Sequence, residues 1–271
     1  MSLPPFVADL PPRVRAELEL FLGALRFFTR LPVPGWVEHS AEHLNRASRY
    51  FPAVGLVVGG IGGFFWIAGS LFWESRTLAV LMALAATLWV TGAFHEDGLA
   101  DMADGFGGGW EKTRILEIMK DSRIGTFGTV ALVLVLLGRF EALVALPEKQ
   151  VFMSLIAAHA ASRFCAISLT RSLQYAREDL LAKAKPLATH LASRDWIMAG
   201  TIALLPALSF AFSFRDLFWA WAFAIAATWW VGRKCRHWLG GYTGDCLGAA
   251  QQAAELAFYL GLLVHLPQAS G

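Results

Sequence analysis

Long apolar segments recur along this chain and restrict the folds that it can adopt. A helix needs roughly 20 residues to cross the ~30 Å hydrocarbon layer of a bilayer, and the apolar segments come close to that length. Of all residues, 56% are hydrophobic and 16% are charged, whereas an average soluble domain has about 25% charged residues. The sequence therefore predicts an all-α, polytopic transmembrane helix bundle of about seven spans. The candidate spans cover residues 52–73, 77–95, 125–146, 151–170, 197–214, 217–232 and 246–266.

The chain reads as a single integral-membrane domain over residues 1–271, with an N-terminal segment (1–51) ahead of the bundle (52–266). Within that segment, residues 15–28 mix charges with an apolar face at helical spacing, which predicts an amphipathic helix lying at the membrane interface. In the first span, Gly55, Gly59 and Gly63 follow one another at four-residue spacing. Such a stripe lets a second helix approach closely.

The distribution of positive charge predicts the orientation of the bundle. Eighteen of the 23 Lys and Arg residues precede the first span or lie in the long polar connections, and three lie in the tight connections near 74–76, 147–150 and 215–216. Lys and Arg collect on the cytoplasmic side of membrane proteins. We therefore expect a protein of the cytoplasmic (inner) membrane, with the N-terminus, the long connections and the active site in the cytoplasm and the C-terminus outside.

Carboxylates gather at the cytoplasmic end of the second predicted span. Asp97, Asp101 and Asp104 stand at i, i+4 and i+7, on one helical face, and Glu96 lies beside them. The residues between them are small or apolar, whereas a solvated acidic helix end, the plainer reading, normally mixes charges of both signs. Oxygen ligands without His or Cys favour a hard cation such as Mg²⁺. The pattern therefore predicts a metal-binding face.

The segment after the acids indicates phosphate chemistry. Gly105 opens a glycine-rich stretch that ends the helix and allows the backbone to approach a ligand. Lys112, Lys120 and Arg123 follow and supply positive charge for a pyrophosphate. Arg30, ahead of the first span, is either an interfacial anchor or a further phosphate contact.

Two charged residues near the ends of later spans have alternative roles. Arg163 lies inside the fourth span, where a charge usually faces the bundle interior. It either reaches the substrate pyrophosphate or pairs with Glu255. Asp245 follows a glycine-rich stretch (240–244) at the start of the last span, where it either caps the helix or contacts substrate or metal.

Two specific alternative functions are compatible with part of this pattern of acids, glycines and basic residues. The run from Asp101 to Gly105 resembles the opening of the CDP-alcohol phosphotransferase motif, and Asp121 falls near its third acid. The motif's Ala-Arg pair is missing, however, and Gly125 stands where a fourth acid would be. A carboxylate-coupled transporter is the other alternative, although its site would lie near the bilayer midplane between sequence repeats.

Five segments in order along the chain are similar to the signatures of the cobalamin (5′-phosphate) synthase family: FFTRLPVP (27–34), RYFPAVGLVVGGIGG (49–63), EDGLADMADGFGGG (96–109), KDSRIGTFG (120–128) and GGYTGDCLGA (240–249). The resemblance implies a Mg²⁺-dependent membrane transferase. Its substrates would be adenosylcobinamide-GDP and α-ribazole or its 5′-phosphate, with GMP released.

The resemblance also implies roles and partners for this chain. Asp97, Asp101 and Asp104, with Glu96 or Asp121, would hold one or two Mg²⁺ ions on the pyrophosphate. A carboxylate not occupied by metal would accept the ribazole hydroxyl proton. The other partner is the lipid bilayer; no nucleic acid is expected, and homo-oligomerisation is left open.

Overall fold

The computed structural model describes residues 5–38, 40–176 and 191–264, and most of them are helical. Within these ranges the β-structure is limited to an isolated bridge between Tyr175 and Tyr242, so the all-α prediction is confirmed. The last two residues of the predicted span 246–266 lie outside the described part. The α-helices are α1 (Pro5–Ala8), α2 (Pro12–Phe28), α3 (Ala41–Ala47), α4 (Phe51–Phe72), α5 (Arg76–Thr91), α6 (Phe94–Gly108), α7 (Lys112–Ile118), α8 (Thr126–Ala145), α9 (Glu148–Ser168), α10 (Ser193–Leu204), α11 (Phe214–Leu239) and α12 (Gly244–Leu263). Short 3₁₀ turns cover Ser48–Tyr50, Leu169–Arg171 and Leu205–Leu208.

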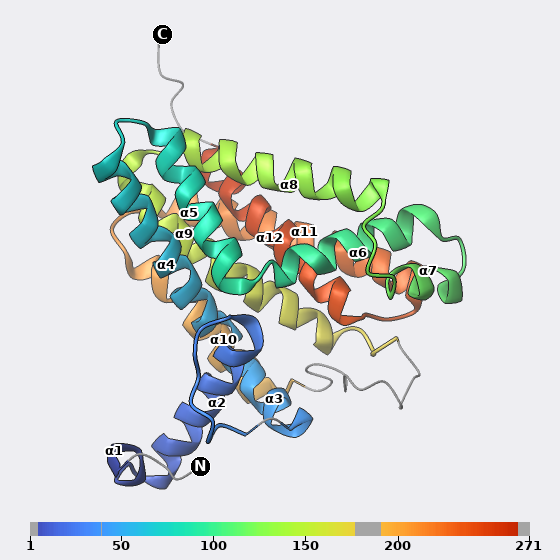
Figure 1. Ribbon diagram of the computed structural model, residues 1–271, viewed down its shortest axis with the longest axis horizontal. Coiled ribbons are helices and arrows are strands. Elements are labelled where there is room, and N and C mark those ends of the chain that lie inside the picture. Colours follow the sequence, from blue (N-terminus) through green and yellow to red (C-terminus); the bar gives the residue numbers. More distant parts are fainter. Residues whose placement is uncertain (1–4, 39, 177–190, 265–271) are drawn as a thin grey trace.

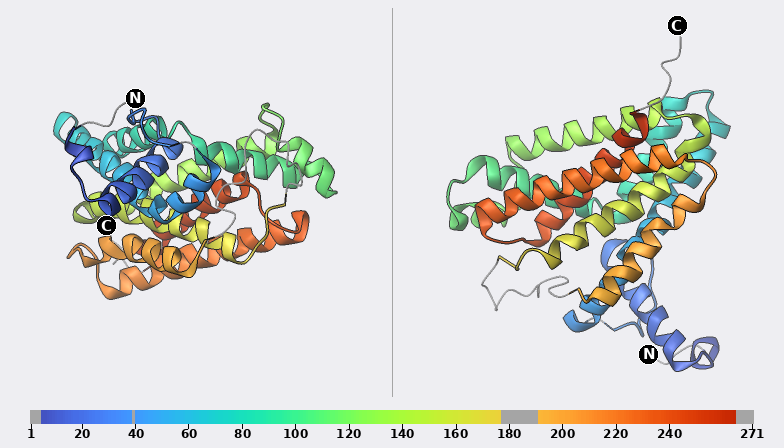
Figure 2. Two further views of the ribbon diagram at one scale, coloured as in Figure 1. Left: turned by 90° about the horizontal axis from the view of Figure 1, so that it is seen from below. Right: turned by 180° about the vertical axis from the view of Figure 1, so that it is seen from behind.

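The connections of the long helices sort to two ends of the molecule (Figure 1). The tight turns at 73–75 and 146–147 lie at one end, and the longer connections at 119–125 and 240–243 lie at the other. Figure 2 shows α11, α12 and α9 running side by side between these ends. The long helices thus run up and down between two ends, as in a membrane bundle.

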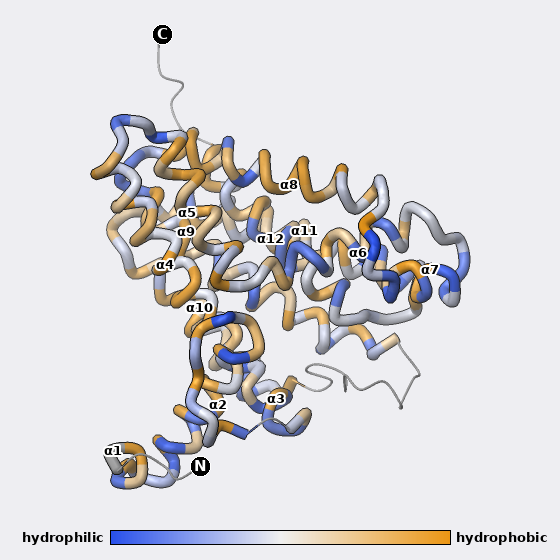
Figure 3. Tube along the Cα trace, in the orientation of Figure 1, coloured by the Kyte–Doolittle hydropathy of each residue, from blue (hydrophilic) through white to orange (hydrophobic). Residues whose placement is uncertain are grey.

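Apolar side chains cover much of the outer surface of the bundle. The tube of Figure 3 is hydrophobic along most of α8 and α4, whereas the stretch around α7 is largely hydrophilic. Leu71 on α4 is 81% exposed and Leu134 on α8 is 64% exposed. In water such surfaces would drive aggregation, so these helices face lipid.

The N-terminal segment contains the predicted amphipathic helix and packs beneath the bundle, and its place at the membrane interface stays a prediction. α2 extends the amphipathic helix expected over 15–28 and buries Leu20, Ala24 and Phe28. The ring of Phe28 meets that of Phe51 at the start of α4, edge to face with centroids 4.5 Å apart. α2 is thereby fixed against the first long helix.

The predicted glycine stripe on α4 meets α9. A Cβ atom added to Gly55 would lie 2.3 Å from the carbonyl oxygen of His159, and one added to Gly59 would lie 2.5 Å from that of Leu155. Only hydrogen fits at these positions, so the two backbones touch.

A sharp bend replaces the straight second span predicted over 77–95. α5 and α6 meet at 86°, and the break is formed by Gly92 and Ala93, with left-handed φ values of 64° and 56°. The N–H of Arg30 donates to the carbonyl of Val90 at 2.8 Å and holds the N-terminal segment against the bend. The acidic segment therefore does not continue α5 in a straight line, and α6 packs against α8 and α12.

The number of spans is only partly settled by the helices. Three helical stretches among the described residues are long and apolar enough to cross a membrane, Ala41–Phe72, Thr126–Ala145 and Glu148–Arg171, and the bent pair α5–α6 would make a fourth. α11 and α12 have 26 and 20 residues, about 39 and 30 Å of helix, but are more polar. The remaining spans of the predicted seven stay a prediction.

Two of the predicted spans have wrong boundaries. The stretch 197–214 is not one helix, because α10 ends at Leu204 and Pro206, which lacks an N–H, lies in the 3₁₀ turn that follows. The short span 217–232 is part of the longer α11, which also contains Arg233 and Arg236. These basic residues were predicted to lie in a connection and belong to the last turns of a helix.

Candidate active site

A cavity of about 740 Å³ opens between α6, α9, α12 and the N-terminal helices. Phenylalanine side chains from α2, α4 and α6 line one part of it, and Asp97, Asp245, Arg163 and Gln251 line other parts. The size suits a small organic ligand, since such pockets measure about 300–1,000 Å³. The cavity therefore combines an aromatic wall with both signs of charge.

The crossing of α6 and α12 brings two of the predicted acids to this cavity. A Cβ atom on Gly98 would lie 3.0 Å from the Cα of Asp245 and 3.3 Å from that of Gly248, so the helices meet at glycines. The neighbouring Asp97 and Asp245 both line the cavity as a result. Asp101, one turn further along α6, is half-buried and is not part of the lining.

Asp245 is not the helix cap that one of its two predicted readings required. Thr243 caps α12, because its hydroxyl accepts the N–H of Cys246 at 3.3 Å. The preceding loop is held by backbone hydrogen bonds, from Tyr242 to Gln174 at 2.9 Å and from Ala176 to Tyr242 at 2.8 Å. This pairing fixes the start of α12, and the carboxylate of Asp245, which accepts the Thr243 hydroxyl at 3.2 Å, lines the cavity.

Asp104 has a different position from the one its spacing suggested. Its two carboxylate oxygens accept the backbone N–H groups of Gly125 at 2.7 Å and Gly128 at 2.8 Å, at the start of α8. A carboxylate at a helix N-terminus satisfies free N–H groups and complements the helix dipole. Asp104 thus braces α6 against α8, so the structure favours a structural role over the predicted catalytic one.

Glu96 also separates from the other acids. It is buried and accepts hydrogen bonds from Arg139 Nη1 at 3.2 Å and Gln252 Nε2 at 2.9 Å. It points into the bundle, one helical step away from the face that carries Asp97. Its predicted place among the metal ligands is therefore replaced by a place in a buried ion network.

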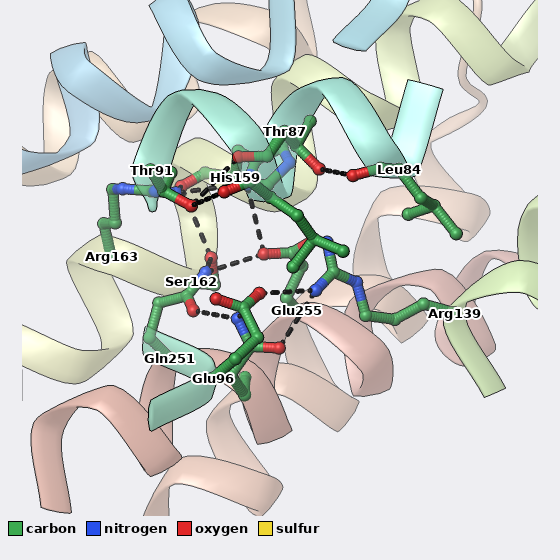
Figure 4. Close-up of polar contacts among 12 residues, drawn as sticks. Leu84, Thr87, Thr91, Glu96, Arg139, His159, Ser162, Arg163, Gln251 and Glu255 are labelled. Atoms are coloured by element: carbon green, nitrogen blue, oxygen red, sulfur yellow. Dashed lines mark hydrogen bonds and ion pairs between the residues drawn. The ribbon is translucent and has the colours of Figure 1, made fainter. Parts of the chain in front are cut away.

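That network joins four helices (Figure 4). Arg139 on α8 pairs with Glu255 on α12 at 2.6 Å, and Glu255 meets His159 Nδ1 on α9 at 3.1 Å. Arg163 lies at the opposite side of the cluster from Arg139, and its Nη1 donates to the carbonyl oxygen of His159 at 2.9 Å. Glu255 is therefore the partner of Arg139, and the predicted ion pair of Arg163 with Glu255 is not found among the described residues. Arg163 lines the cavity, and its contact with a substrate pyrophosphate stays a prediction.

Several other predicted residues lie in or near a second, smaller cavity of about 310 Å³, beside α7. Asp104, Asp121 and Arg123 line it. Asp121 pairs with Arg123 at 2.7 Å, and hydrogen bonds from Arg123 lower the pKa of the Asp121 carboxyl to about 2. Lys112 and Lys120 are exposed nearby on α7 and just after it. The basic residues Lys112, Lys120 and Arg123 therefore lie apart from the large cavity that Asp97 lines.

Gly105 and Arg30 both have structural contacts. A Cβ atom on Gly105 would lie 2.6 Å from the side chain of Met119, so this glycine permits tight packing of α6 on the end of α7. The Arg30 side chain lies over the bend, because a Cβ atom on Gly92 would lie 2.4 Å from Arg30 Nε. Neither residue lines the large cavity.

The carboxylates that line the large cavity are suited to bind Mg²⁺ only together with a bound substrate. Within the described residues, no three His, Cys, Asp or Glu side chains lie close enough together to hold a metal ion. Mg²⁺ is commonly bound by one or two carboxylates together with water and substrate phosphates. The oxygen donors of Asp97 and Asp245 on one cavity fit that kind of binding.

Comparison with known proteins decides the family. The family model described as cobalamin-5-phosphate synthase matches residues 20–263. The chain belongs to the cobalamin-5-phosphate synthase family. Among its relatives, the adenosylcobinamide-GDP ribazoletransferase of Shewanella piezotolerans is 44% identical over 255 residues, covering 92% of this chain and 96% of the relative. That of Vibrio cholerae serotype O1 is 44% identical over 259 residues, covering 93% and 96%, and that of Ralstonia nicotianae is 46% identical over 237 residues, covering 86% and 90%.

No solved structure matches the chain, so the site of this cobalamin-5-phosphate synthase family member has to be read from its own geometry. The sequence located Asp97, Asp245 and Arg163 but missed Gln251 and the phenylalanine wall. Gln251 stands one turn before Glu255 inside an apolar segment. A polar residue within such a segment was the sequence signal that could have located it in the cavity. The phenylalanines carried no such signal, because their spacing is that of ordinary core residues.

Proposed function

We propose that this chain joins adenosylcobinamide-GDP to α-ribazole, or to its 5′-phosphate, and releases GMP. The 3′-hydroxyl of the ribazole attacks the phosphorus next to cobinamide. A new P–O bond forms to the ribazole, the P–O bond to GMP breaks, and the hydroxyl proton is lost. The product is adenosylcobalamin or its phosphate, which agrees with the names of the relatives and of the family.

The large cavity is the single observation that connects the proposed reaction with particular residues of this chain. It lies where the most specific signature, residues 96–109, crosses the signature of residues 240–249, and both contribute to its lining. A transporter would instead need a site near the bilayer midplane between repeats. The acids and the aromatic wall meet in a cavity beside the long-connection end, which suits an enzyme whose large substrates arrive from water.

The residues have separate tasks in this reaction. Asp97 or Asp245, together with the substrate pyrophosphate, would hold Mg²⁺, and the ion when bound neutralises charge as the phosphoryl group transfers. The one of these two carboxylates that the ion leaves unoccupied accepts the proton of the ribazole hydroxyl. The phenylalanine wall shields the reacting groups from water, and Arg163 supplies a fixed positive charge for phosphate.

The first test uses detergent-purified protein with adenosylcobinamide-GDP, α-ribazole and Mg²⁺, and measures GMP and the corrinoid product together. Equal amounts of both, lost with EDTA and in Asp97→Asn, would support the proposal. Glu148→Gln is the matched control, because Glu148 is exposed at the start of α9 at the tight-turn end. No product from folded protein would overturn the proposal, and ion flux through vesicles would then favour a transporter.

The proposed orientation places the cavity and the long connections in the cytoplasm and the tight turns outside, in the inner membrane. The native Cys165, Cys235 and Cys246 are buried, so cysteines introduced at exposed sites can be labelled selectively. An impermeant maleimide added from outside should label Glu74→Cys in the α4–α5 turn but not Ser122→Cys between α7 and α8. The reverse pattern would invert the topology.

A further inference from the structure

A buried arginine at the cavity wall has an unused hydrogen-bond donor. Arg163 is only 2% exposed and lines the cavity. Its Nη1 contacts the carbonyl oxygen and Nδ1 of His159 at 2.9 and 3.2 Å, while its Nε has no hydrogen-bond partner among the described residues. A buried guanidinium is costly unless an anion pairs with it, so the site lacks a negative group that a ligand would bring.

The neighbouring carboxylates do not fill that role. Glu255 pairs with Arg139 at 2.6 Å, and Glu96 pairs with the same arginine at 3.2 Å. In the part of the chain that the structure describes, no carboxylate forms an ion pair with Arg163 within 4.0 Å. Arg139 thus takes both acids of the buried network, and Arg163 remains as a fixed positive charge facing the cavity.

The size and shape of the cavity limit which anionic groups can reach the guanidinium of Arg163. The cavity of about 740 Å³ can enclose a nucleotide-sized molecule, whereas a corrin ring with its side chains would stay outside it. The pyrophosphate of the donor is substituted on both sides, by guanosine and by cobinamide, and therefore needs two exits from its binding place. A terminal phosphate, substituted at one oxygen only, can enter to the depth of a buried arginine.

The family description supplies the chemistry of such a group. Members make cobalamin 5-phosphate, and the 5-phosphate of that product is not the phosphoryl group transferred from the donor. It must therefore enter with the acceptor. We propose, resting on the function proposed above, that Arg163 binds the 5′-phosphate of a phosphorylated ribazole acceptor and so makes this enzyme prefer that acceptor.

The rest of the cavity accommodates the other parts of the same molecule. Phe27, Phe28 and Phe94 form an edge-to-face cluster with centroids 4.9 to 5.6 Å apart, and flat aromatic groups pack well against such walls. The flat base of the ribazole lies against this cluster. The ribose between base and phosphate then faces Asp97 and Asp245, where its 3′-hydroxyl is deprotonated.

The test compares two acceptors in one enzyme preparation. kcat/KM is measured for α-ribazole 5′-phosphate and for α-ribazole with the wild type, Arg163→Gln and Arg163→Lys. The wild type should prefer the phosphorylated acceptor, Arg163→Gln should lower that preference at least tenfold, and Arg163→Lys should keep part of it. Arg13→Gln is the charge-matched control, because Arg13 is exposed at the far end of α2, and its preference should equal that of the wild type.

A second measurement does not depend on the folding of a variant. Inorganic phosphate should inhibit the wild type competitively against α-ribazole 5′-phosphate, because both occupy the Arg163 site, and it should not compete with α-ribazole, which leaves that site empty. Competition against adenosylcobinamide-GDP instead, or an unchanged preference in folded Arg163→Gln, would overturn the assignment. Lack of turnover with either acceptor would refute the proposed function itself, so the two failures are distinguishable.

Discussion

Asp97 and Asp104 stand on one face of α6, seven residues apart, and yet they meet different surroundings. Asp97 lines the large cavity, whereas both oxygens of Asp104 accept backbone N–H groups at the start of α8. Residue spacing showed that the two share a helical face. It did not show what faces each of them, because that depends on where α8 and α12 cross α6.

The two aspartates should therefore respond differently to the same substitution. Asp104→Asn should lower the free energy of unfolding by about 1–3 kcal/mol, because the amide NH₂ group cannot accept an N–H and leaves one donor unsatisfied. Thermal unfolding in detergent would measure this. Asp97→Asn, the matched control, should keep the wild-type Tm but lose activity. Equal Tm values for wild type and Asp104→Asn would contradict the bracing role.

At the scale of helices, the contact between α4 and α9 depends on the absence of side chains. A Cβ atom on Gly59 would lie 2.5 Å from the carbonyl oxygen of Leu155 and 2.6 Å from the Cα of Ile156. Gly60, the next residue, has nothing within 4 Å of an added Cβ. Gly59 is therefore in tight contact with α9, whereas its neighbour Gly60 faces open space.

This contrast gives a prediction with an internal control. Gly59→Ala should destabilise the protein by roughly 1–3 kcal/mol, since the two helix backbones must separate to admit the methyl group. Gly60→Ala should be neutral or stabilising by up to about 1 kcal/mol, because alanine restricts the unfolded chain more than glycine does. Both are measured as shifts in Tm in detergent. A Gly60→Ala variant as unstable as Gly59→Ala, or a Gly59→Ala variant as stable as the wild type, would contradict the close packing of α4 on α9.

The sequence predicted the helices better than their interruptions. Hydrophobic length located α4, α8, α9 and α12 because apolar runs of that length have few alternatives to a buried or lipid-facing helix. The bend at Ala93 was missed, since alanine favours a continuous helix and only tertiary contacts such as Arg30 hold it in a left-handed conformation. The end of α10 was also missed, although Pro206 marked a break.

At the scale of the whole molecule, the polar interior joins helices that lie far apart in the sequence. Glu96, Arg139, His159 and Glu255 come from α6, α8, α9 and α12, in that order, and pair within the bundle. The sequence showed buried charges but not their pairing, because helix order along the chain does not determine helix neighbours. With Arg163 included, the two arginines and two glutamates balance, so the interior is neutral while the cavity still faces a positive group.

Pairing of this kind should appear as strong coupling between Arg139 and Glu255. Arg139→Met alone should cost about 3–5 kcal/mol, because it leaves two buried carboxylates against one arginine. Adding Glu255→Gln restores the balance of charge, so the double variant should be more stable than the sum of the single effects predicts, by about 0.5–3 kcal/mol.

The exposed pair Arg114–Glu117, 3.1 Å apart on α7, is the control for this cycle. Its coupling should be only about 0.2–0.5 kcal/mol, because water screens surface charges. Additive effects at Arg139 and Glu255 would mean that water or lipid headgroups reach the interior. The buried cluster would then be an open polar channel rather than the sealed support that keeps Arg163 facing the cavity.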